Sequence, residues 1–300
     1  MPSIRTRDGH DLFVRVLGRG SPCLLVHGFA SSSRSWLPFV APLLHRHRFI
    51  LPDLRGFGHS HRVPLPEPCP LTVYAHDLED VLDALRIREL PVVGISMGAF
   101  TTLQSFRLFG GKRFNRYLHV DQGPIVHNRD DYPFGMLGAG QPAFFERLRA
   151  LLTALDDERM QQRYDDLPPE LRAEFWGVLG EFSAAAVTTE GARALVRTLA
   201  RQEPLMRRLL PVERWQVYVQ IARAYLERNY DLRDAFRNIA VPMTVLIGGA
   251  SRMYPPAGQH TIKELAPHAR IRELPNVGHH VPFEAPRLFL RELRDFLAAA

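Results

Sequence analysis

Short apolar runs alternate with amphipathic stretches along most of the chain. Six runs have the length and composition of buried strands, at residues 23–27, 49–53, 91–96, 117–121, 243–248 and 270–274. Residues 4–17 alternate apolar and polar side chains around Asp8-Gly9, a pair that favours a hairpin turn. Residues 71–85 repeat apolar side chains at the spacing of a helix packed on a sheet. The pattern predicts an α/β fold with a mostly parallel, doubly wound sheet of eight strands.

This alternation stops between residues 124 and 240, where the pattern becomes helical with proline breaks. The stretch is rich in large apolar side chains, namely Phe134, Met136, Leu137, Phe144, Phe145, Phe175, Trp176, Phe182, Trp215, Tyr218, Tyr225 and Tyr230. We expect most of them to form the core of this insert or its contact with the sheet, and the rest to line an apolar pocket. The chain is therefore predicted to contain a sheet domain, residues 1–123 and 241–300, and an all-helical insert, residues 124–240.

The segment Gly94-Ile95-Ser96-Met97-Gly98 ends a predicted strand and leads directly into helix-compatible sequence. So sharp a turn forces Ser96 into a strained backbone conformation and requires nearly side-chain-free neighbours, which Gly94 and Gly98 are. The serine hydroxyl is then held out of the sheet, with the N–H of Met97 beside it at a helix N-terminus. The pattern indicates a nucleophilic serine, although taken alone it would also fit a structural strand-to-helix turn.

Two further segments supply groups that a nucleophilic serine needs. Residues 22–29 form a buried run that stops at a His-Gly pair, where a turn can aim the N–H of Phe29 into a cleft. Residues 276–284 place His279 on a loop before the last amphipathic helix. The nucleophile, the turn and the imidazole thus come from widely separated parts of the chain.

A fourth motif, Asp-Leu-Arg-Gly-Phe-Gly-His-Ser at residues 53–60, follows another predicted strand. With this motif included, the chain resembles the α/β-hydrolase family over nearly its whole length, with the motifs in the family's order. The resemblance implies that the helical insert is a cap over the site, as in many members of the family. Because the elbow carries serine rather than aspartate, the resemblance argues against haloalkane dehalogenase and epoxide hydrolase activity.

The base and nucleophile follow from elementary acid–base chemistry. A serine hydroxyl needs an imidazole to take its proton, and the imidazole needs a carboxylate to hold its tautomer and stabilise its charged form. Ser96 and His279 are predicted to fill the first two roles, since His279 directly follows Gly278 and so matches the family's Gly-His pair. His280 is the alternative base and is otherwise a loop residue that packs or contacts substrate.

The acid departs from the family's common pattern. Most relatives carry it just after the seventh strand, in a segment like Gly-x-x-Asp, but residues 247–255 contain no carboxylate and Ser251 holds its usual place. A serine there could hydrogen-bond the imidazole but could not offset its charge. Some members place the acid after the sixth strand, where this chain has Asp121. We predict Asp121 as the acid, with a loop-capping role as its alternative. Asp53 is a weaker candidate, since the matching aspartate usually braces its own loop.

The oxyanion hole is predicted to consist of the backbone N–H groups of Phe29 and Met97. His27 and Gly28 would shape the turn that carries Phe29, and we assign His27 a structural role. Arg55 is interpreted as a brace of its loop, with a substrate clamp as the alternative.

Charge and composition exclude several other classes of protein. The chain has 38 basic and 32 acidic residues, a net charge of +6, but the basic residues are scattered, which favours surface arginines over a nucleic-acid site. No stretch approaches the roughly 20 apolar residues that span a bilayer, and the first residues lack an apolar signal core, so we expect a cytoplasmic protein. Cys23 and Cys69 are interpreted as reduced thiols. No metal-ligand spacing, phosphate loop or dinucleotide fingerprint is found, so no metal and no cofactor are predicted.

Together these features predict a serine hydrolase that cleaves carboxylic esters of apolar acyl groups, medium-chain or aromatic, through an acyl-enzyme. Hydrolysis of a carbon–carbon bond, a lactone or a thioester by the same triad stays open. A receptor that keeps the fold and binds a ligand without turnover is the alternative from a different class. The expected partner is a small, apolar, ester-like molecule, and a homodimer is left open.

Overall fold

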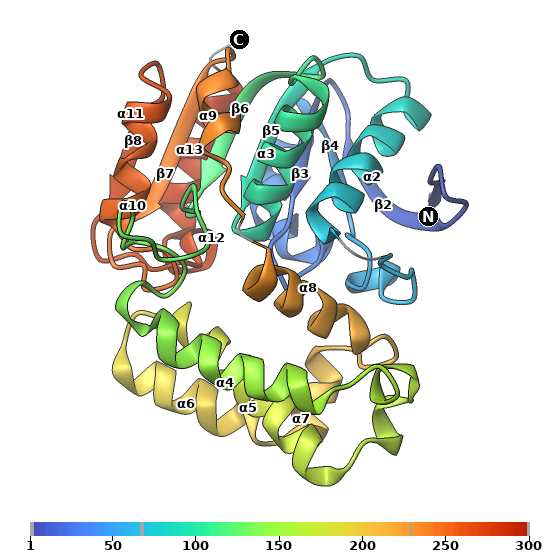
Figure 1. Ribbon diagram of the computed structural model, residues 1–300. Coiled ribbons are helices and arrows are strands. Elements are labelled where there is room, and N and C mark those ends of the chain that lie inside the picture. The colour runs from blue at the N-terminus through green and yellow to red at the C-terminus, as the bar shows by residue number, and fades with distance from the viewer. Residues whose placement is uncertain (1–2, 67–68, 229, 299–300) are drawn as a thin grey trace.

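The computed structural model describes residues 3–66, 69–228 and 230–298 (Figure 1). Residues 1–2 and 299–300, the outer limits of the predicted sheet domain, lie outside the described residues. Within these ranges one sheet is formed by β1 (Ser3–Arg5), β2 (Asp11–Gly18), β3 (Ser21–Val26), β4 (His47–Pro52), β5 (Leu90–Ile95), β6 (Phe114–Val120), β7 (Met243–Gly248) and β8 (Arg270–Leu274).

The strand order across the sheet is β1-β2-β4-β3-β5-β6-β7-β8. β2 pairs antiparallel with β1 and β4, and the strands from β4 to β8 across the sheet pair in parallel. The predicted α/β fold with a mostly parallel sheet of eight strands is therefore confirmed. β4, the strand that follows β3 in the chain, lies on one side of β3, and β6, the strand that follows β5, lies on the opposite side of β5. The strand order therefore reverses between β3 and β5. Open α/β sheets bind ligands in the crevice at the carboxyl ends of such strands.

Helices cover both faces of this sheet (Figure 1). The helices of the sheet domain are α1 (Leu37–Val40), α2 (Pro70–Ala84), α3 (Met97–Phe109), α9 (Arg233–Asn238), α10 (Pro256–His260), α11 (Ile262–Leu265), α12 (Val281–Glu284) and α13 (Pro286–Ala298). α2 and α3 pack side by side, and their buried leucines and aromatics form one core with the sheet. On the other face, α13 buries Phe289 and Leu293 against Trp36, Phe39 and the strands.

The remaining helices form a separate layer beyond the carboxyl ends of the strands (Figure 1). They are α4 (Gln141–Ala154), α5 (Pro169–Ala185), α6 (Glu190–Ala200), α7 (Glu203–Leu209) and α8 (Gln216–Glu227). α8 contacts both α4 and α2, and thus lies between this layer and the sheet domain. The division of the chain at residues 123/124 and 240/241 stays a prediction. α9 falls inside the predicted insert but packs against α3 and α11 of the sheet domain.

Four predicted strands end one residue earlier in the structure, and two of these ends directly precede the predicted nucleophile and acid. β5 ends at Ile95 and β6 at Val120, each one residue before the predicted end. The next residues, Ser96 and Asp121, have φ angles of 53° and 43°, which an extended strand cannot accommodate. The chain therefore turns at both residues, and both lie at the same edge of the sheet.

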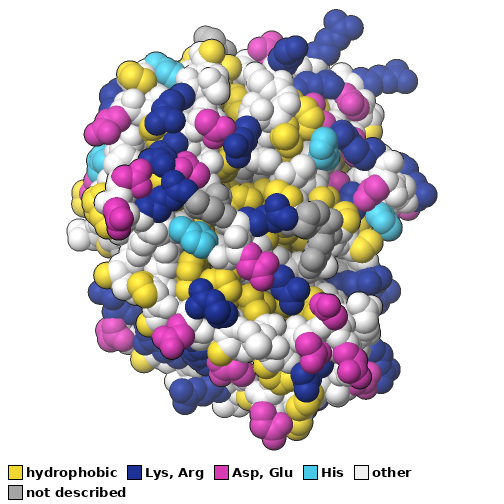
Figure 2. Space-filling model, in the orientation of Figure 1, with side chains coloured by type: hydrophobic (Ala, Val, Ile, Leu, Met, Phe, Trp, Pro, Cys, Tyr) yellow, Lys and Arg dark blue, Asp and Glu magenta, His cyan; other side chains and the backbone are white. Residues whose placement is uncertain are grey.

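The surface carries its charges in mixed order. On the face seen in Figure 2, Lys and Arg side chains are interspersed with Asp and Glu and form no continuous basic stripe. Many arginines are paired, as Arg147 is with Glu174 and Glu181. This arrangement agrees with the interpretation of the excess arginines as solvated surface residues. None of the helices in the described part of the chain is both long and apolar enough to cross a membrane.

Candidate active site

Ser96 lies at the tightest turn of the site, between β5 and α3. Its φ and ψ angles are 53° and −127°, a strained conformation for a residue with a side chain. A Cβ atom on Gly94 would lie 2.7 Å from the Ala99 Cα, and one on Gly98 would lie 2.3 Å from the Val26 carbonyl oxygen. Only glycine fits at either position, and the spacing Gly-x-Ser-x-Gly follows from that crowding.

The hydroxyl of Ser96 is hydrogen-bonded to a histidine from a distant loop. The Oγ atom of Ser96 lies 2.9 Å from Nε2 of His279, and Nδ1 of His279 lies 2.7 Å from Oδ2 of Asp121. His279 is 4% exposed and Asp121 is fully buried. The structure thus brings together the three residues predicted as nucleophile, base and acid. His280, the alternative base, is a neighbour whose ring centroid lies 5.7 Å from that of His279.

The carboxylate of Asp121 is held by three further donors. Its Oδ1 atom accepts hydrogen bonds from the Gly248 N–H at 2.8 Å and from Nε2 of Gln259 at 2.9 Å. The Ser251 hydroxyl donates to Oδ2 at 2.7 Å. Since a buried charge is tolerated only when it is paired and hydrogen-bonded, these contacts explain how the side chain is accommodated and oriented. Ser251 therefore contacts the carboxylate, rather than the imidazole that sequence reasoning considered as its partner.

The turn after β3 passes directly against this elbow. A Cβ atom on Gly28 would lie 3.2 Å from the Ser96 Cβ, so this turn and the elbow are in close contact. The next N–H belongs to Phe29, and Met97 supplies the first N–H of α3, a position without a partner inside the helix. Neither of these two amides donates a hydrogen bond to a protein atom within residues 3–66, 69–228 and 230–298. Phe29 and Met97 line the same cavity as Ser96, and their role as an oxyanion hole stays a prediction.

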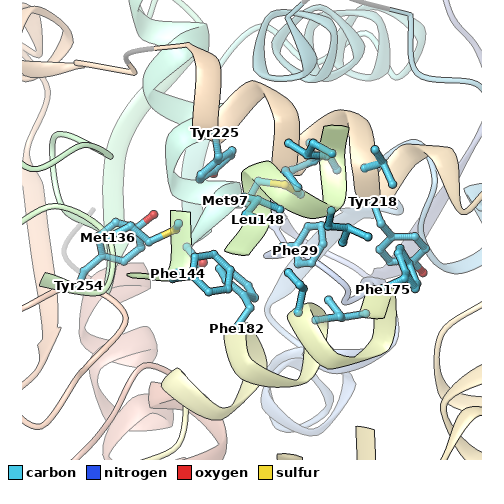
Figure 3. A pocket seen from close by; sticks show the side chains of 18 residues that line it. Phe29, Met97, Met136, Phe144, Leu148, Phe175, Phe182, Tyr218, Tyr225 and Tyr254 are labelled. Atoms are coloured by element: carbon cyan, nitrogen blue, oxygen red, sulfur yellow. The ribbon is translucent and has the colours of Figure 1, made fainter. Parts of the chain in front are cut away.

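An apolar cavity, here called the inner cavity, extends from Ser96 into the layer formed by α4 to α8, here called the cap. It is lined by Phe29, Ser96, Met97, Met136, Phe144, Leu148, Leu151, Leu152, Phe175, Val178, Leu179, Phe182, Tyr218, Val219, Ile221, Ala222, Tyr225 and Tyr254. Figure 3 shows these side chains converging from α4, α5 and α8 and from the sheet domain. The lining holds no Asp, Glu, Lys, Arg or His side chain. The cavity is therefore suited to an apolar group and poorly suited to a charged one.

Comparison with known proteins shows the family to which the chain belongs. Residues 23–292 match the model of the Alpha/beta hydrolase family. The chain belongs to that family. Among solved structures, the esterase EaEST from Exiguobacterium antarcticum superposes with a TM-score of 0.73 at 21% identity, with 99% of each chain covered. At that identity the likeness shows a shared hydrolase fold.

Two curated relatives of this chain differ in how much of their length aligns with it. The pimeloyl-[acyl-carrier protein] methyl ester esterase of Stenotrophomonas maltophilia is 26% identical over 275 residues, which are 91% of this chain and 90% of the relative. The non-heme chloroperoxidase CPO-A1 of Kitasatospora aureofaciens is 33% identical over 99 residues. This second match spans only about a third of each protein, 33% of this chain and 35% of the relative.

His27 connects the turn after β3 to the loop after β4. Its Nδ1 donates to the Gly28 carbonyl at 2.8 Å, and its Nε2 accepts from the Leu54 N–H at 3.0 Å. The ring is fully buried, and burial lowers its pKa, so the neutral imidazole makes both contacts. The structural role assigned to His27 is consistent with these bonds.

Arg55 and Asp53 brace loops at the edge of the site. The Arg55 guanidinium, 1% exposed, binds Asp77 at 2.6 Å and Asp8 at 2.6 Å. This position favours the brace interpretation over a substrate clamp. Asp53 accepts from the Ser33 N–H at 2.5 Å and from the His59 N–H at 2.7 Å. Among the described residues, the hydrogen-bond partner of the His279 Nδ1 atom is Asp121 and not Asp53.

Sequence reasoning missed two residues of this site. Gln259 on α10 holds Asp121, and Tyr254 lines the inner cavity with its ring centroid 6.1 Å from that of His279. Neither belongs to a motif, and only the folded loop after β7 brings them to the sheet edge. In the described part of the chain, no group of three or more His, Cys, Asp or Glu side chains could hold a metal ion. The absence of a cofactor stays a prediction.

Proposed function

We propose that this protein is a serine hydrolase that cleaves carboxylic esters with an apolar acyl group. The observation that carries the proposal is the unbroken hydrogen-bond chain from Asp121 through His279 to Ser96 at the wall of an apolar cavity. The names of the relatives add support, since a methyl ester esterase aligns over 91% of this chain and an esterase shares its fold. Asp121, His279 and Ser96 are assigned as acid, base and nucleophile on this basis.

The reaction has two halves that share one proton carrier. The Oγ atom of Ser96 attacks the ester carbonyl carbon while its proton passes to Nε2 of His279. The carbon–oxygen bond to the alcohol then breaks, and His279 gives the same proton to the departing alcohol oxygen. Water next attacks the acyl-serine and loses a proton to His279. When the bond to Ser96 breaks, that proton returns to the serine and the carboxylic acid leaves.

The carbonyl oxygen becomes negative in each tetrahedral intermediate. We assign the N–H groups of Phe29 and Met97 as the donors that stabilise this oxygen. A single preorganised donor of this kind lowers the barrier by about 2.7–4 kcal/mol. Because each donor belongs to the backbone, the hole does not depend on the side chains at positions 29 and 97.

The inner cavity supports an apolar acyl group. Each methylene that moves from water into such a cavity contributes about 0.8 kcal/mol. A charged acyl group would lose its hydration without gaining a partner, since the lining holds no charged side chain. A medium-chain or aromatic acyl group fits these properties.

The decisive experiment combines covalent labelling with hydrolysis. A fluorophosphonate probe should label the wild-type protein at Ser96, and Ser96→Ala should not react. p-Nitrophenyl esters of graded acyl length should be hydrolysed by the wild type, with a loss of about 10⁴-fold or more in Ser96→Ala. Absence of labelling together with absence of turnover on every ester would overturn the proposal and favour a ligand-binding receptor.

A further inference from the structure

Two cavities, and not one, meet at Ser96. The second, here called the outer cleft, is lined by Gly28, Phe29, Ala30, Ser31, Ser35, Trp36, Ile95, Ser96, Phe182, Ser183, Ala186, Met206, Leu209, Leu210, Met253, His279, His280, Pro282 and Phe283. It shares only Phe29, Ser96 and Phe182 with the inner cavity. An ester bound at Ser96 therefore has two compartments available, one on each side of its carbonyl carbon.

The position of His279 decides which half of an ester occupies which compartment. His279 lines the outer cleft and does not line the inner cavity. In the reaction proposed above, Nε2 of His279 must hand a proton to the alcohol oxygen as the carbon–oxygen bond breaks, so that oxygen must lie on the side of His279. The acyl group, which stays on Ser96 after the alcohol has left, then lies in the inner cavity.

The two compartments differ in the exposure of their walls and in their size. The residues that line the inner cavity are all buried or half-buried. The outer cleft is bordered by apolar side chains that face solvent, with Leu209 at the end of α7 65% exposed and Phe283 on α12 56% exposed. The inner cavity also has the smaller free volume, about 80 Å³ against about 340 Å³ in the outer cleft, so a short group fits the inner cavity and a longer group fits the outer cleft.

We propose that the substrates are esters of a length-limited apolar acid with a long or bulky apolar alcohol, and that Phe182 is the specificity-determining residue between the two compartments. This inference rests on the proposed function. Phe182 lies on α5 and lines both compartments. Its ring centroid is 5.5 Å from that of Phe29, edge to face, and 6.1 Å from that of Phe144. This half-buried ring is therefore part of the wall that the two compartments share.

Two isomeric esters test the assignment. Dodecyl butanoate and butyl dodecanoate have the same atoms and nearly the same hydrophobicity, but they place the long chain on opposite sides of the carbonyl. Below their solubility limits, the wild type should hydrolyse dodecyl butanoate with a kcat/KM about tenfold or more above that of butyl dodecanoate. Equal rates, or a preference for butyl dodecanoate, would overturn the assignment.

Phe182→Ala tests the partition. Loss of the ring joins the compartments, so a long acyl chain gains a path into the outer cleft and the ratio of the two kcat/KM values should fall to near one. Phe145→Ala is the matched control, because Phe145 is a cap phenylalanine on α4 that lines neither cavity. The control should keep the wild-type ratio even if its stability falls. An unchanged ratio in Phe182→Ala, or an equal fall in Phe145→Ala, would overturn the role of Phe182.

The controls separate this inference from the proposed function. If Ser96 reacts with the fluorophosphonate and short p-nitrophenyl esters are hydrolysed, but the isomers are not distinguished, only the assignment of the compartments fails. If neither the probe nor any ester reacts, the proposed function fails and the assignment fails with it.

Discussion

The sheet side and the cap side of the site are held by different forces. On the sheet side, polar contacts of 2.7–2.9 Å fix Asp121 to Gly248, Ser251, Gln259 and His279. On the cap side, the walls of the inner cavity are apolar side chains of α4, α5 and α8 that are held by packing. The two sides thus meet at Ser96 with directional bonds on one side and non-directional contacts on the other.

This difference separates the chemistry from the choice of substrate. Hydrogen bonds weaken steeply with misalignment, so a network of them sets the positions of the atoms that exchange protons. Hydrophobic contacts depend on buried area and shape, so the cap can vary its side chains and keep the fold. A substitution on the sheet side should lower turnover for every ester, whereas one on the cap side should affect some esters only.

The largest effect is expected from Asp121→Asn. The amide cannot hold His279 in the tautomer that accepts the Ser96 proton, so kcat should fall about 10⁴-fold for all esters while the protein stays folded. Steady-state hydrolysis and circular dichroism would measure the two properties. Asp53→Asn is the matched control, and its kcat should fall much less. Near-normal activity in Asp121→Asn would show that another group serves as the acid.

Leu148→Trp tests the cap side. Leu148 on α4 is 3% exposed and lines the inner cavity, where an indole would occupy the space of about three methylenes. The kcat/KM for a p-nitrophenyl decanoate should fall about 50-fold, the equivalent of three methylenes at about 0.8 kcal/mol each. The acetate ester is the internal control and should keep its rate. A uniform loss on both esters would mean that the indole disturbs the triad.

Ser251→Ala removes one donor from the sheet side. Without the hydroxyl, Oδ2 of Asp121 keeps His279 but loses a charge-assisted hydrogen bond, so kcat should fall about tenfold on every ester. Ser105→Ala is the control. Ser105 donates a hydrogen bond of 3.4 Å to the Glu79 carboxylate, and neither residue lines either cavity. It should lose stability without loss of kcat. Equal activity of Ser251→Ala and wild type would show that the hydroxyl has no part in turnover.

His119 is expected to affect stability and not turnover. It lies fully buried on β6, between the Tyr117 hydroxyl and the Gln122 carbonyl, and burial lowers its pKa from 6.5 to about 4. Between these pH values the unfolded chain takes up a proton that the native chain does not, so acid favours unfolding by up to about 1.4 kcal/mol per pH unit. Denaturant unfolding at pH 7.5, 6 and 5 should show this slope. His119→Gln should reduce it, and an unchanged slope would exclude His119 as its source.

Much of the site could be predicted from short segments. Gly94 and Gly98 reveal the elbow because each stands where no side chain fits; Gly94 is crowded by Ala99 in the same turn, and Gly98 by the Val26 carbonyl of the neighbouring strand. The strands were predicted to within a few residues because buried parallel strands are short apolar runs. Ser96 and Asp121 were placed inside strands that end one residue earlier, since a positive φ angle leaves no mark in hydrophobic periodicity.

The sequence by itself therefore determined the fold class, the elbow and the order of the candidate triad, because these depend on local backbone sterics and on hydrophobic periodicity. Only the tertiary structure decided that Asp121, and not Asp53, contacts His279, that Ser251 and Gln259 hold that carboxylate, and that Phe182 stands between two cavities. These contacts join residues up to 158 positions apart. Which residues come into contact over such distances depends on the packing of whole helices and loops. No short segment of sequence carries that information.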